Sequence, residues 1–367
     1  MKKNKKKKIL LTCAGGYGAL NFIDSLIKKN TSYEFFGTHS HKYFLYRSNF
    51  RKNYLVPPAI QEKAYIQKTK KIINENKIDL IIPKSDIEVQ MIGKHRKLLG
   101  CNVFLPDQKD IDNTQDKLNF YKLLKDTKVP LAKTFQIKKL KEVEKYISKI
   151  PKIEKKYWIR IKTAGTAGAY GASWVQNKNE VINWIQRCRR QSKIKISDFI
   201  ISEFLPGRLF EILFLYKDGI CIFGKVYENL KFLNSANAGN IGVGSSPELA
   251  SSINDKLSMK ALINGQLTIL SIAKKLKTIP NGIYHMSLKE NINKNPCVTE
   301  VNIGRTPSTI NIFNNVGNIN ASKELLNCAL GFKNKKHSKV FDLDSKKTLF
   351  IRSFDYKTTI IDIKNKI

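Results

Sequence analysis

The amino-acid sequence predicts a mixed fold, with an N-terminal α/β unit followed by a two-lobed α+β region. Within residues 1–112, short apolar segments of strand character alternate with helical segments, which is typical of a parallel sheet covered by helices on both faces. From about residue 198 onward, strand-like runs follow one another and are interrupted by a long helical segment, residues 255–276. The 367 residues suffice for two or three packed units with sizeable cores.

The N-terminal unit can be followed element by element. Its first strand, KKILL, ends in the turn Ala14-Gly15-Gly16-Tyr17-Gly18, which resembles a dinucleotide-binding loop but lacks the GxGxxG pattern, so it is weak evidence for nucleotide binding. Asp86 follows the third strand, at the edge where such sheets bind ligands, and is a candidate contact for a second substrate. The other expected elements are strands over 33–38, 78–83 and 102–105 and helices over 19–29 and 87–99.

The net charge of +36 does not by itself predict a nucleic-acid-binding protein. Only ten of the 66 basic residues are arginine, and the lysines are spread along a chain that is also rich in asparagine and isoleucine. Lysine, asparagine and isoleucine have A/T-rich codons, so genome composition accounts for the pattern. The sequence contains no zinc-finger spacing, aromatic RNA-binding motif or helix-turn-helix pattern. We therefore expect no dedicated nucleic-acid binding, although a basic surface attracts polyanions at low salt.

The sequence also predicts neither a membrane-spanning nor a secreted protein. No run approaches the roughly 20 apolar residues that cross a bilayer. The basic start MKKNKKKKILLTCAGG contains an apolar run of five residues, shorter than the roughly 7 to 15 of a signal peptide. The six cysteines are scattered without a CxxC pair, which indicates reduced, mostly buried thiols. We expect a cytoplasmic protein.

The segment GIYHMSLKENINKNPCVTEVNIGR (282–305) is the most informative part of the chain. It reads as strand, polar turn, strand, and the second strand ends in Glu300-Val301-Asn302 with Arg305 close behind. Because side chains alternate along a strand, Glu300 and Asn302 point the same way. A carboxylate and an amide oxygen beside an arginine suit Mg²⁺ and the phosphates that it carries. Taken alone, the pattern is equally common at a polar strand end with a surface arginine.

Three other blocks precede this strand. DKLNFYKLLKDTKVP (116–130) reads as a helix that ends at Val129-Pro130, and YWIRIKTAGTAGAYG (157–171) is a β-rich run that breaks into glycines. FIISEFLPGRLFEI (199–212) is an apolar strand that leads through a Pro-Gly turn to a second strand. In this order, over about 190 residues, the four blocks resemble the ATP-grasp superfamily. They are most similar to carbamoyl-phosphate synthase large-subunit-like proteins and D-alanine–D-alanine ligases.

The resemblance implies a domain organisation. Residues 1–112 would form a Rossmann-like pre-ATP-grasp domain, and residues 113–195 the N-terminal ATP-grasp lobe with a glycine lid. Residues 196–325 would form the C-terminal lobe with the Mg-ATP site, and residues 326–367 a closing segment. No internal repeat is visible, so the chain would hold a single ATP-grasp unit. A homodimer is a further possibility.

The resemblance also assigns roles to residues. Lys117 and either Arg160 or Lys162, with Arg160 preferred, would contact the nucleotide phosphates, and Arg305 and Arg160 would stabilise the transferring phosphoryl group. The loop 236–246 would face the substrate. The implied phosphate contacts are Lys117, Arg160 and Lys162, and the implied lid contains Gly165, Gly168 and Gly171. The implied adenine contacts are Glu203, Phe204 and Leu205, and the implied ribose contact is Glu211.

One departure concerns the metal. The implied ligands are Glu300, Asn302 and Ser287, and Ser287 stands where relatives carry Asp or Gln. Serine is a poor Mg²⁺ ligand. Three alternatives remain. Glu300 and Asn302 hold the metal with help from the triphosphate, or Glu290 supplies a further ligand, or the catalytic activity is weak or lost. Arg305 also sits one place later than in the usual Asn-Pro-Arg pattern.

The predicted function is an ATP-dependent ligase that joins a small carboxylic acid to an amine through an acyl phosphate, with ATP and Mg²⁺ (or Mn²⁺) bound. The sequence names neither substrate. Two alternatives remain open: a carbamoyl-phosphate-synthase-like enzyme that activates bicarbonate, and a catalytically weak nucleotide-binding homologue.

Overall fold

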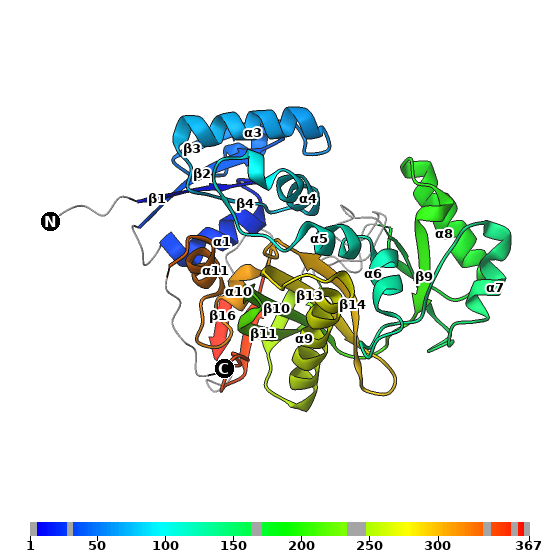
Figure 1. Cartoon of the computed structure of the whole chain (residues 1–367). Coiled ribbons are helices and arrows are strands. Elements are labelled where there is room, and N and C mark those ends of the chain that lie inside the picture. The colour runs from blue at the N-terminus through cyan, green and yellow to red at the C-terminus, as the bar shows by residue number, and fades with distance from the viewer. Residues whose placement is uncertain are drawn as a thin grey trace.

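The computed structural model describes residues 6–27, 32–162, 171–232, 247–332, 339–353 and 359–362. Within these ranges the strands form a five-stranded, a four-stranded and a seven-stranded sheet. Figure 1 shows the five-stranded sheet with helices α3 and α4 at the top, the seven-stranded sheet with helix α9 below, and a smaller lobe with α7 and α8 at the side.

The N-terminal unit is the predicted parallel sheet between helices. Strand order is β3-β2-β1-β4-β5, so the order reverses between β1 and β4. Ser85 begins helix α4 by accepting a hydrogen bond from the backbone of Glu88. The elements are β1 (Lys7–Leu11), α1 (Tyr17–Ile27), β2 (Tyr33–His39), α2 (Lys42–Leu45), β3 (Lys52–Leu55), α3 (Glu62–Asn76), β4 (Leu80–Ile82), α4 (Asp86–Lys94), the 3₁₀ helix η1 (Arg96–Leu98), β5 (Asn102–Val103) and α5 (Gln108–Thr114).

The smaller lobe has its own sheet, in the order β6-β9-β7-β8, and its own apolar core, which includes Ile159, Val181 and Phe199. The predicted boundary at residue 196 would assign the strand at 199–203 to the next lobe. The strand instead pairs with β6 and β7, because its buried face completes this core. Helix α6 (Lys117–Leu124) precedes this lobe, and its Phe120 and Leu124 belong to the apolar cluster shared with α9 and β14. The elements of the lobe are β6 (Thr134–Gln136), η2 (Leu140–Glu142), α7 (Val143–Ile147), β7 (Tyr157–Ile161), β8 (Ser173–Val175), α8 (Lys178–Gln191), η3 (Ile196–Asp198) and β9 (Phe199–Glu203).

The seven-stranded sheet has the order β14-β13-β10-β11-β12-β15-β16, and its neighbouring strands are antiparallel. Helix α9 lies along one face, and Asp255 begins it with a capping box. The predicted closing segment contributes β15, which pairs with β12. The elements are β10 (Leu209–Lys217), β11 (Ile220–Phe232), β12 (Pro247–Ser252), α9 (Lys256–Leu276), β13 (Gly282–Glu290), β14 (Pro296–Ile303), α10 (Ile310–Phe313), α11 (Ala321–Ala329), β15 (Thr348–Ile351) and β16 (Thr359–Asp362).

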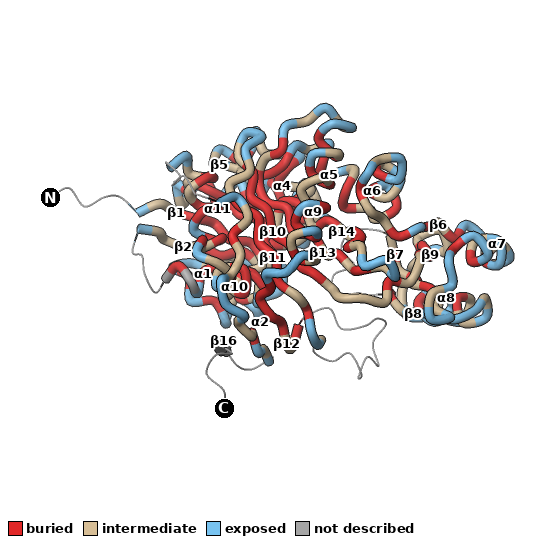
Figure 2. Tube along the Cα trace, turned by 90° about the horizontal axis from the view of Figure 1, so that it is seen from below, coloured by how far each residue is buried: buried red, intermediate tan, exposed pale blue. Residues whose placement is uncertain are grey.

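One apolar cluster joins the N-terminal unit to the large sheet. It runs from Val89 and Ile92 on α4 through Ile111 on α5 to Val301 on β14 and Ile272 on α9. Figure 2 shows the buried segments gathered where these elements meet. The two parts therefore form one packed body, with the end of β14 held against α4. No helix among the described residues is long and apolar enough to cross a membrane.

Candidate functional site

The predicted metal-binding side chains lie on one face at the end of β14. In the ladder with β13, Glu300 pairs with Ser287 and Asn302 pairs with His285. The side-chain nitrogen Nδ2 of Asn302 lies 3.5 Å from Oε1 of Glu300 and 3.3 Å from Nδ1 of His285. The alternation of β14 thus brings Glu300 and Asn302 together, as their spacing predicts.

Cations from three elements surround Glu300. Nζ of Lys117, the first residue of α6, lies 3.7 Å from Glu300 Oε2. Arg160 of β7 donates a 2.9 Å hydrogen bond to the carbonyl oxygen of Thr299. Burial alone would raise the pKa of Glu300, but the positive charges of Lys117 and Arg160, with smaller effects of His285 and Arg305, lower it below its usual value. Glu300 is therefore held as a carboxylate, the form that binds a metal.

Arg160 has donor capacity left over. Its Nε is buried and has no hydrogen-bond partner among the described residues. Burial lowers the pKa of Arg160, and the charge of Glu300 opposes this effect. A buried donor without a partner is costly, so the Nε position favours a ligand that accepts a hydrogen bond. Lys162, the alternative phosphate contact, lies 3.9 Å from Asp116 instead. The geometry therefore favours Arg160 over Lys162 as a residue that needs an anionic ligand.

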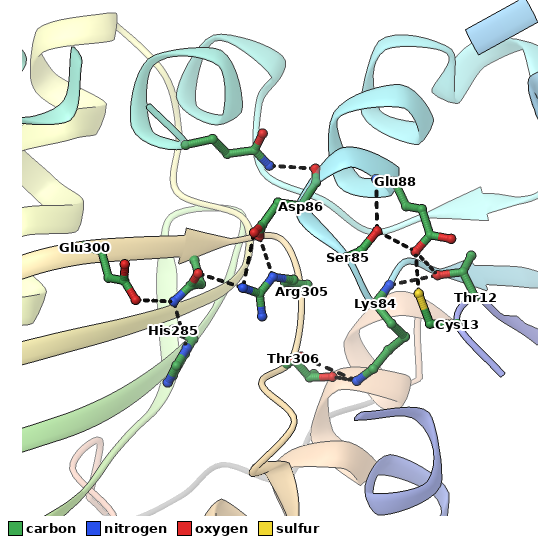
Figure 3. Close-up of polar contacts among 12 residues, drawn as sticks. Thr12, Cys13, Lys84, Ser85, Asp86, Glu88, His285, Glu300, Arg305 and Thr306 are labelled. Atoms are coloured by element: carbon green, nitrogen blue, oxygen red, sulfur yellow. Dashed lines mark hydrogen bonds and ion pairs between the residues drawn. The ribbon is translucent and has the colours of Figure 1, made fainter. Parts of the chain in front are cut away.

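Arg305 joins the end of β14 to the N-terminal sheet. Its guanidinium donates to both oxygens of Asp86 and, at 2.7 Å, to Oδ1 of Asn302 (Figure 3). Gly304 makes this turn possible, because its φ of +77° disfavours side chains and an added Cβ would lie 2.8 Å from a methyl group of Val89. Asp86, predicted as a substrate-side residue, thus lies in the same network as the metal-binding pair.

Glu211 and Ser287 lie side by side on β10 and β13. The Ser287 hydroxyl is 3.0 and 2.9 Å from the two carboxylate oxygens of Glu211. Asn229 donates to Glu211 at 3.3 Å, and Nε2 of His285 lies 2.8 Å from Glu211 Oε2 without the alignment of a hydrogen bond. His285 links this group to Asn302. The sequence reasoning missed His285, because its apolar neighbours read as a buried strand.

Glu290, considered as a replacement metal ligand, does not reach this group. It lies at the far end of β13, opposite Pro296, and its carboxylate accepts a 3.2 Å hydrogen bond from the backbone of Arg208. The alternation of β13 turns it away from the face that carries Ser287. The expectation that Glu290 could supply the missing ligand is wrong.

The predicted adenine-side segment lies between the smaller lobe and the large sheet. Glu203 ends β9, and the ring of Phe204 lies beneath the ammonium groups of Lys156 at 5.1 Å and Lys289 at 5.4 Å. Leu205 is buried. These positions agree with a hinge between two lobes, while their contact with adenine stays a prediction.

The predicted lid falls partly on described residues. Gly171 has a φ of +70°, and a Cβ there would lie 2.3 Å from Cδ1 of Ile161, so the position requires glycine. Gly165 and Gly168, and the predicted substrate loop 236–246, lie outside the described residues.

A further cation lies near Arg305. Lys84 follows β4, is only 8% exposed, and its ammonium contacts the side chain of Thr306. Burial lowers the pKa of Lys84 to about 7, and the charge of Arg305 acts in the same direction, while Cys13 and Glu88 oppose it. Sequence reasoning missed Lys84, although its place directly after a buried strand, beside Asp86, is a usable signal.

We expect Lys84→Met to raise the melting temperature most below about pH 7 and progressively less toward pH 10.5. The folded protein binds the proton of Lys84 with a pKa of about 7, and the unfolded chain with the ordinary value of 10.5, so the folded state is penalised at low pH and the penalty fades between these values. One pKa unit is about 1.4 kcal/mol, which makes the gain a few kcal/mol. Thermal unfolding at about pH 6 and about pH 9.5 measures it. A gain independent of pH would contradict the assignment.

Comparison with known proteins shows which solved structures have a similar fold. No known family profile matches the sequence, and no curated protein matches it. Solved structures do match. The biotin carboxylase domain of the 2-oxoglutarate carboxylase of Hydrogenobacter thermophilus aligns over 94% of this chain and 74% of its own, with a TM-score of 0.72 and 13% identity.

Two further structures are similar over comparable lengths. The N5-carboxyaminoimidazole synthetase of Staphylococcus aureus gives a TM-score of 0.67 at 12% identity, over 96% of this chain and 83% of its own. The L-amino acid ligase of Bacillus licheniformis gives 0.66 at 11% identity, over 95% and 80%. These neighbours are ATP-grasp enzymes with an N-terminal domain before the ATP-grasp lobes. The chain therefore has the ATP-grasp fold, as the order of its four sequence blocks predicts.

Proposed function

We propose that the protein is an ATP-dependent ligase that joins a carboxylic acid to an amine and releases ADP and phosphate. One observation carries the proposal: Lys117 of α6, Arg160 of β7 and Arg305 in the turn after β14 gather around Glu300 and Asn302 at the end of β14. Such a concentration of cations next to an ionised carboxylate suits a metal-bound triphosphate. The structural neighbours are ATP-grasp ligases, which supports the same reading.

The residues present fit Mg²⁺ or Mn²⁺. Glu300 is held ionised, and Asn302 carries an amide oxygen, so both have oxygen atoms of the kind that hard cations prefer. The Asn302 oxygen accepts a hydrogen bond from Arg305 in this structure, so a metal would have to share it or take it over. Ser287 is a third position on the same face, with its hydroxyl directed at Glu211. A bound Mg²⁺ would supply charge neutralisation at the phosphates. The 2-oxoglutarate carboxylase domain was crystallised with MgADP, which agrees with this assignment for a related fold.

The chain's own groups then have distinct tasks. Lys117 and the unpaired Nε of Arg160 would bind phosphate oxygens, and Arg305 would stabilise charge on the transferring phosphoryl group. The substrate carboxylate oxygen attacks the γ-phosphorus and ADP leaves, giving an acyl phosphate. The amine nitrogen then bonds to the acyl carbon, phosphate leaves, and the nitrogen loses a proton. Positioning and charge stabilisation supply most of the rate.

The adenosine would lie at the hinge. Glu203, Phe204 and Leu205 would border the adenine, and Glu211 would hold the ribose. Glu211 already accepts hydrogen bonds from Ser287 and Asn229, so a ribose contact would add to an existing network. Gly171 would terminate the lid.

Release of ADP tests the proposal. Purified protein with ATP and Mg²⁺ should release ADP only when an acid and an amine are both present, and a screen over acids crossed with amines identifies the pair. Bicarbonate belongs among the acids, because the 2-oxoglutarate carboxylase domain was crystallised with bicarbonate and a bicarbonate-activating enzyme is the second candidate. An Mg²⁺-independent ADP signal, or none with any pair, would contradict the ligase function.

Ser287→Asp separates an intact metal site from a decayed one. The new carboxylate would lie beside Glu211, whose oxygens are now 3.0 and 2.9 Å from the serine hydroxyl, so like charges should lower the melting temperature of the metal-free protein. Added Mg²⁺ and ATP should raise the melting temperature again, and by more than in the natural chain, because a carboxylate is a stronger metal ligand than a serine hydroxyl. Turnover that rises at the same time would indicate a decayed site. Unchanged turnover would show that Glu300 and Asn302 suffice.

A further inference from the structure

The carboxyl edge of the N-terminal sheet carries charged side chains that the proposed nucleotide site does not use. Ligands of open α/β sheets bind outside the strand ends where strand order reverses, and here the reversal lies between β1 and β4. Thr12 and Cys13 follow β1 at this edge, and Lys84 follows β4. Figure 3 shows the edge facing Arg305 and Thr306, at the end of β14.

Lys84 is the cation of this edge without a counter-charge. Its ammonium contacts Thr306, through the hydroxyl and, at 3.5 Å, the carbonyl oxygen, and it lies 5.1 Å from the ring of Phe22. No ion pair joins Lys84 to a carboxylate among the described residues. Arg305, its neighbour, is already paired with Asp86. A lysine buried to this degree is almost always paired, so the arrangement has a place for an anion.

Glu88 does not fill that place, because neutral donors occupy its carboxylate. The hydroxyls of Thr12 and Ser85 donate to its Oε2 at 2.6 and 2.9 Å, and the thiol of Cys13 at 3.2 Å. Tyr65 donates to Oε1 at 3.4 Å. This network fixes the loops after β1 and β4. Thr12 also accepts a 2.8 Å hydrogen bond from the backbone of Lys84, which holds the lysine in position.

We propose that Lys84 binds an acidic group, a carboxylate or a phosphate, carried by the amine substrate. The assignment rests on the proposed ligase function, in which Arg305 faces the phosphoryl group on the activated acid. Thr306, the contact of Lys84, is the next residue in the chain, so a group held by Lys84 lies beside the reacting centre. In Figure 3 Lys84 lies on the other side of Arg305 from Glu300, so this group would approach from the N-terminal sheet. An acidic amine would be anchored there with its nitrogen free to attack.

Matched pairs of amines test the proposal by thermal shift, which needs no turnover. Glycine is compared with methylamine, and phosphoethanolamine with ethanolamine, at one fixed high salt concentration that suppresses nonspecific binding to a basic surface. We expect the acid-bearing member of one pair to raise the melting temperature and its acid-free partner to leave it unchanged. The pair that responds identifies the acidic group as carboxylate or phosphate.

Three proteins are compared: the natural chain, Lys84→Met and the control Lys109→Met, which removes one exposed lysine from α5. The shift should persist in the control and disappear in Lys84→Met, whose cooperative melting shows that it is folded. Equal shifts from both members of a pair, a shift retained in Lys84→Met, or no response of the natural chain to either acid-bearing amine would overturn the proposal. If the shift occurs but no acid leads to ADP release, the anion site stands and the ligase function fails.

Discussion

Replacing Glu300 by glutamine should abolish the metal-dependent part of ATP binding and reduce ADP release by about a hundredfold or more. Glutamine keeps the size of the side chain and one acceptor oxygen, but it replaces the other oxygen with an amide group and removes the charge that Lys117 and Arg160 surround. Loss of the carboxylate weakens metal binding. Lys117 and Arg160 then repel each other without an anion between them. The melting temperature with ATP and Mg²⁺ is compared with that obtained with ATP and EDTA. In the natural chain a difference is expected, since ligand at 100 times its Kd adds about 2.7 kcal/mol to stability.

Glu144→Gln is the matched control, because it removes one exposed carboxylate from α7 without touching this group. It should bind ATP and Mg²⁺ like the natural chain. A shift in Glu300→Gln equal to that of the natural chain would refute the assignment of Glu300 as a metal ligand. If ATP stabilises all three proteins equally with and without metal, binding is an unspecific effect of the basic surface.

Replacing Asp86 by alanine should destabilise the folded protein by about 3–5 kcal/mol. Asp86 accepts two of the hydrogen bonds of the Arg305 guanidinium, and both side chains are largely buried, at 14% and 15% exposure. Burial tends to lower the pKa of Arg305, but Asp86, with smaller effects of Glu300 and Cys13, raises it above its usual value, so Arg305 is held in its charged form. Without Asp86 a buried cation stands unpaired near Lys84. Urea unfolding of the two proteins measures the loss.

A double-mutant cycle gives this expectation its control. Removing both charges, in Asp86→Ala with Arg305→Met, should cost less than removing Asp86 alone, because no unpaired charge remains. Asp112→Ala removes an exposed acid from α5 and should be nearly neutral. Additive losses in the cycle would show that the contact between Asp86 and Arg305 contributes no coupling energy.

Much of the fold follows from local patterns in the sequence. The parallel sheet, the long helix α9 and the strand pair β13–β14 have clear periodicity, and the structure places them within a few residues of the expected positions. Glu300 and Asn302 could be predicted as neighbours, since strand alternation alone determines that they share a face. Asp86 could be placed at the ligand edge, because the carboxyl ends of parallel strands define it.

The remaining contacts depend on packing that no local pattern contains. Asp86 and Arg305 are 219 positions apart and meet only because α4 packs against the end of β14. Their pairing requires Gly304 to turn the chain, a property visible in the sequence only as one more glycine. The strand at 199–203 was assigned to the wrong sheet for the same reason, since both sheets offer an apolar face. The place of Lys84 after β4 can be seen in the sequence, but its burial without an ion pair to a carboxylate can be seen only in the structure.

The apolar cluster that α4, α5, β14 and α9 share affects how this architecture could have changed during evolution. The smaller lobe packs around a core of its own, which includes Ile159, Val181 and Phe199, so an exchange for a homologous lobe by recombination would leave the core of the rest of the protein intact. An exchanged N-terminal unit would instead need helices whose apolar side chains already pack against Val301 and Ile272. Changes of substrate at this edge should therefore have arisen by single substitutions within the existing N-terminal unit, such as a substitution that introduces a lysine after β4.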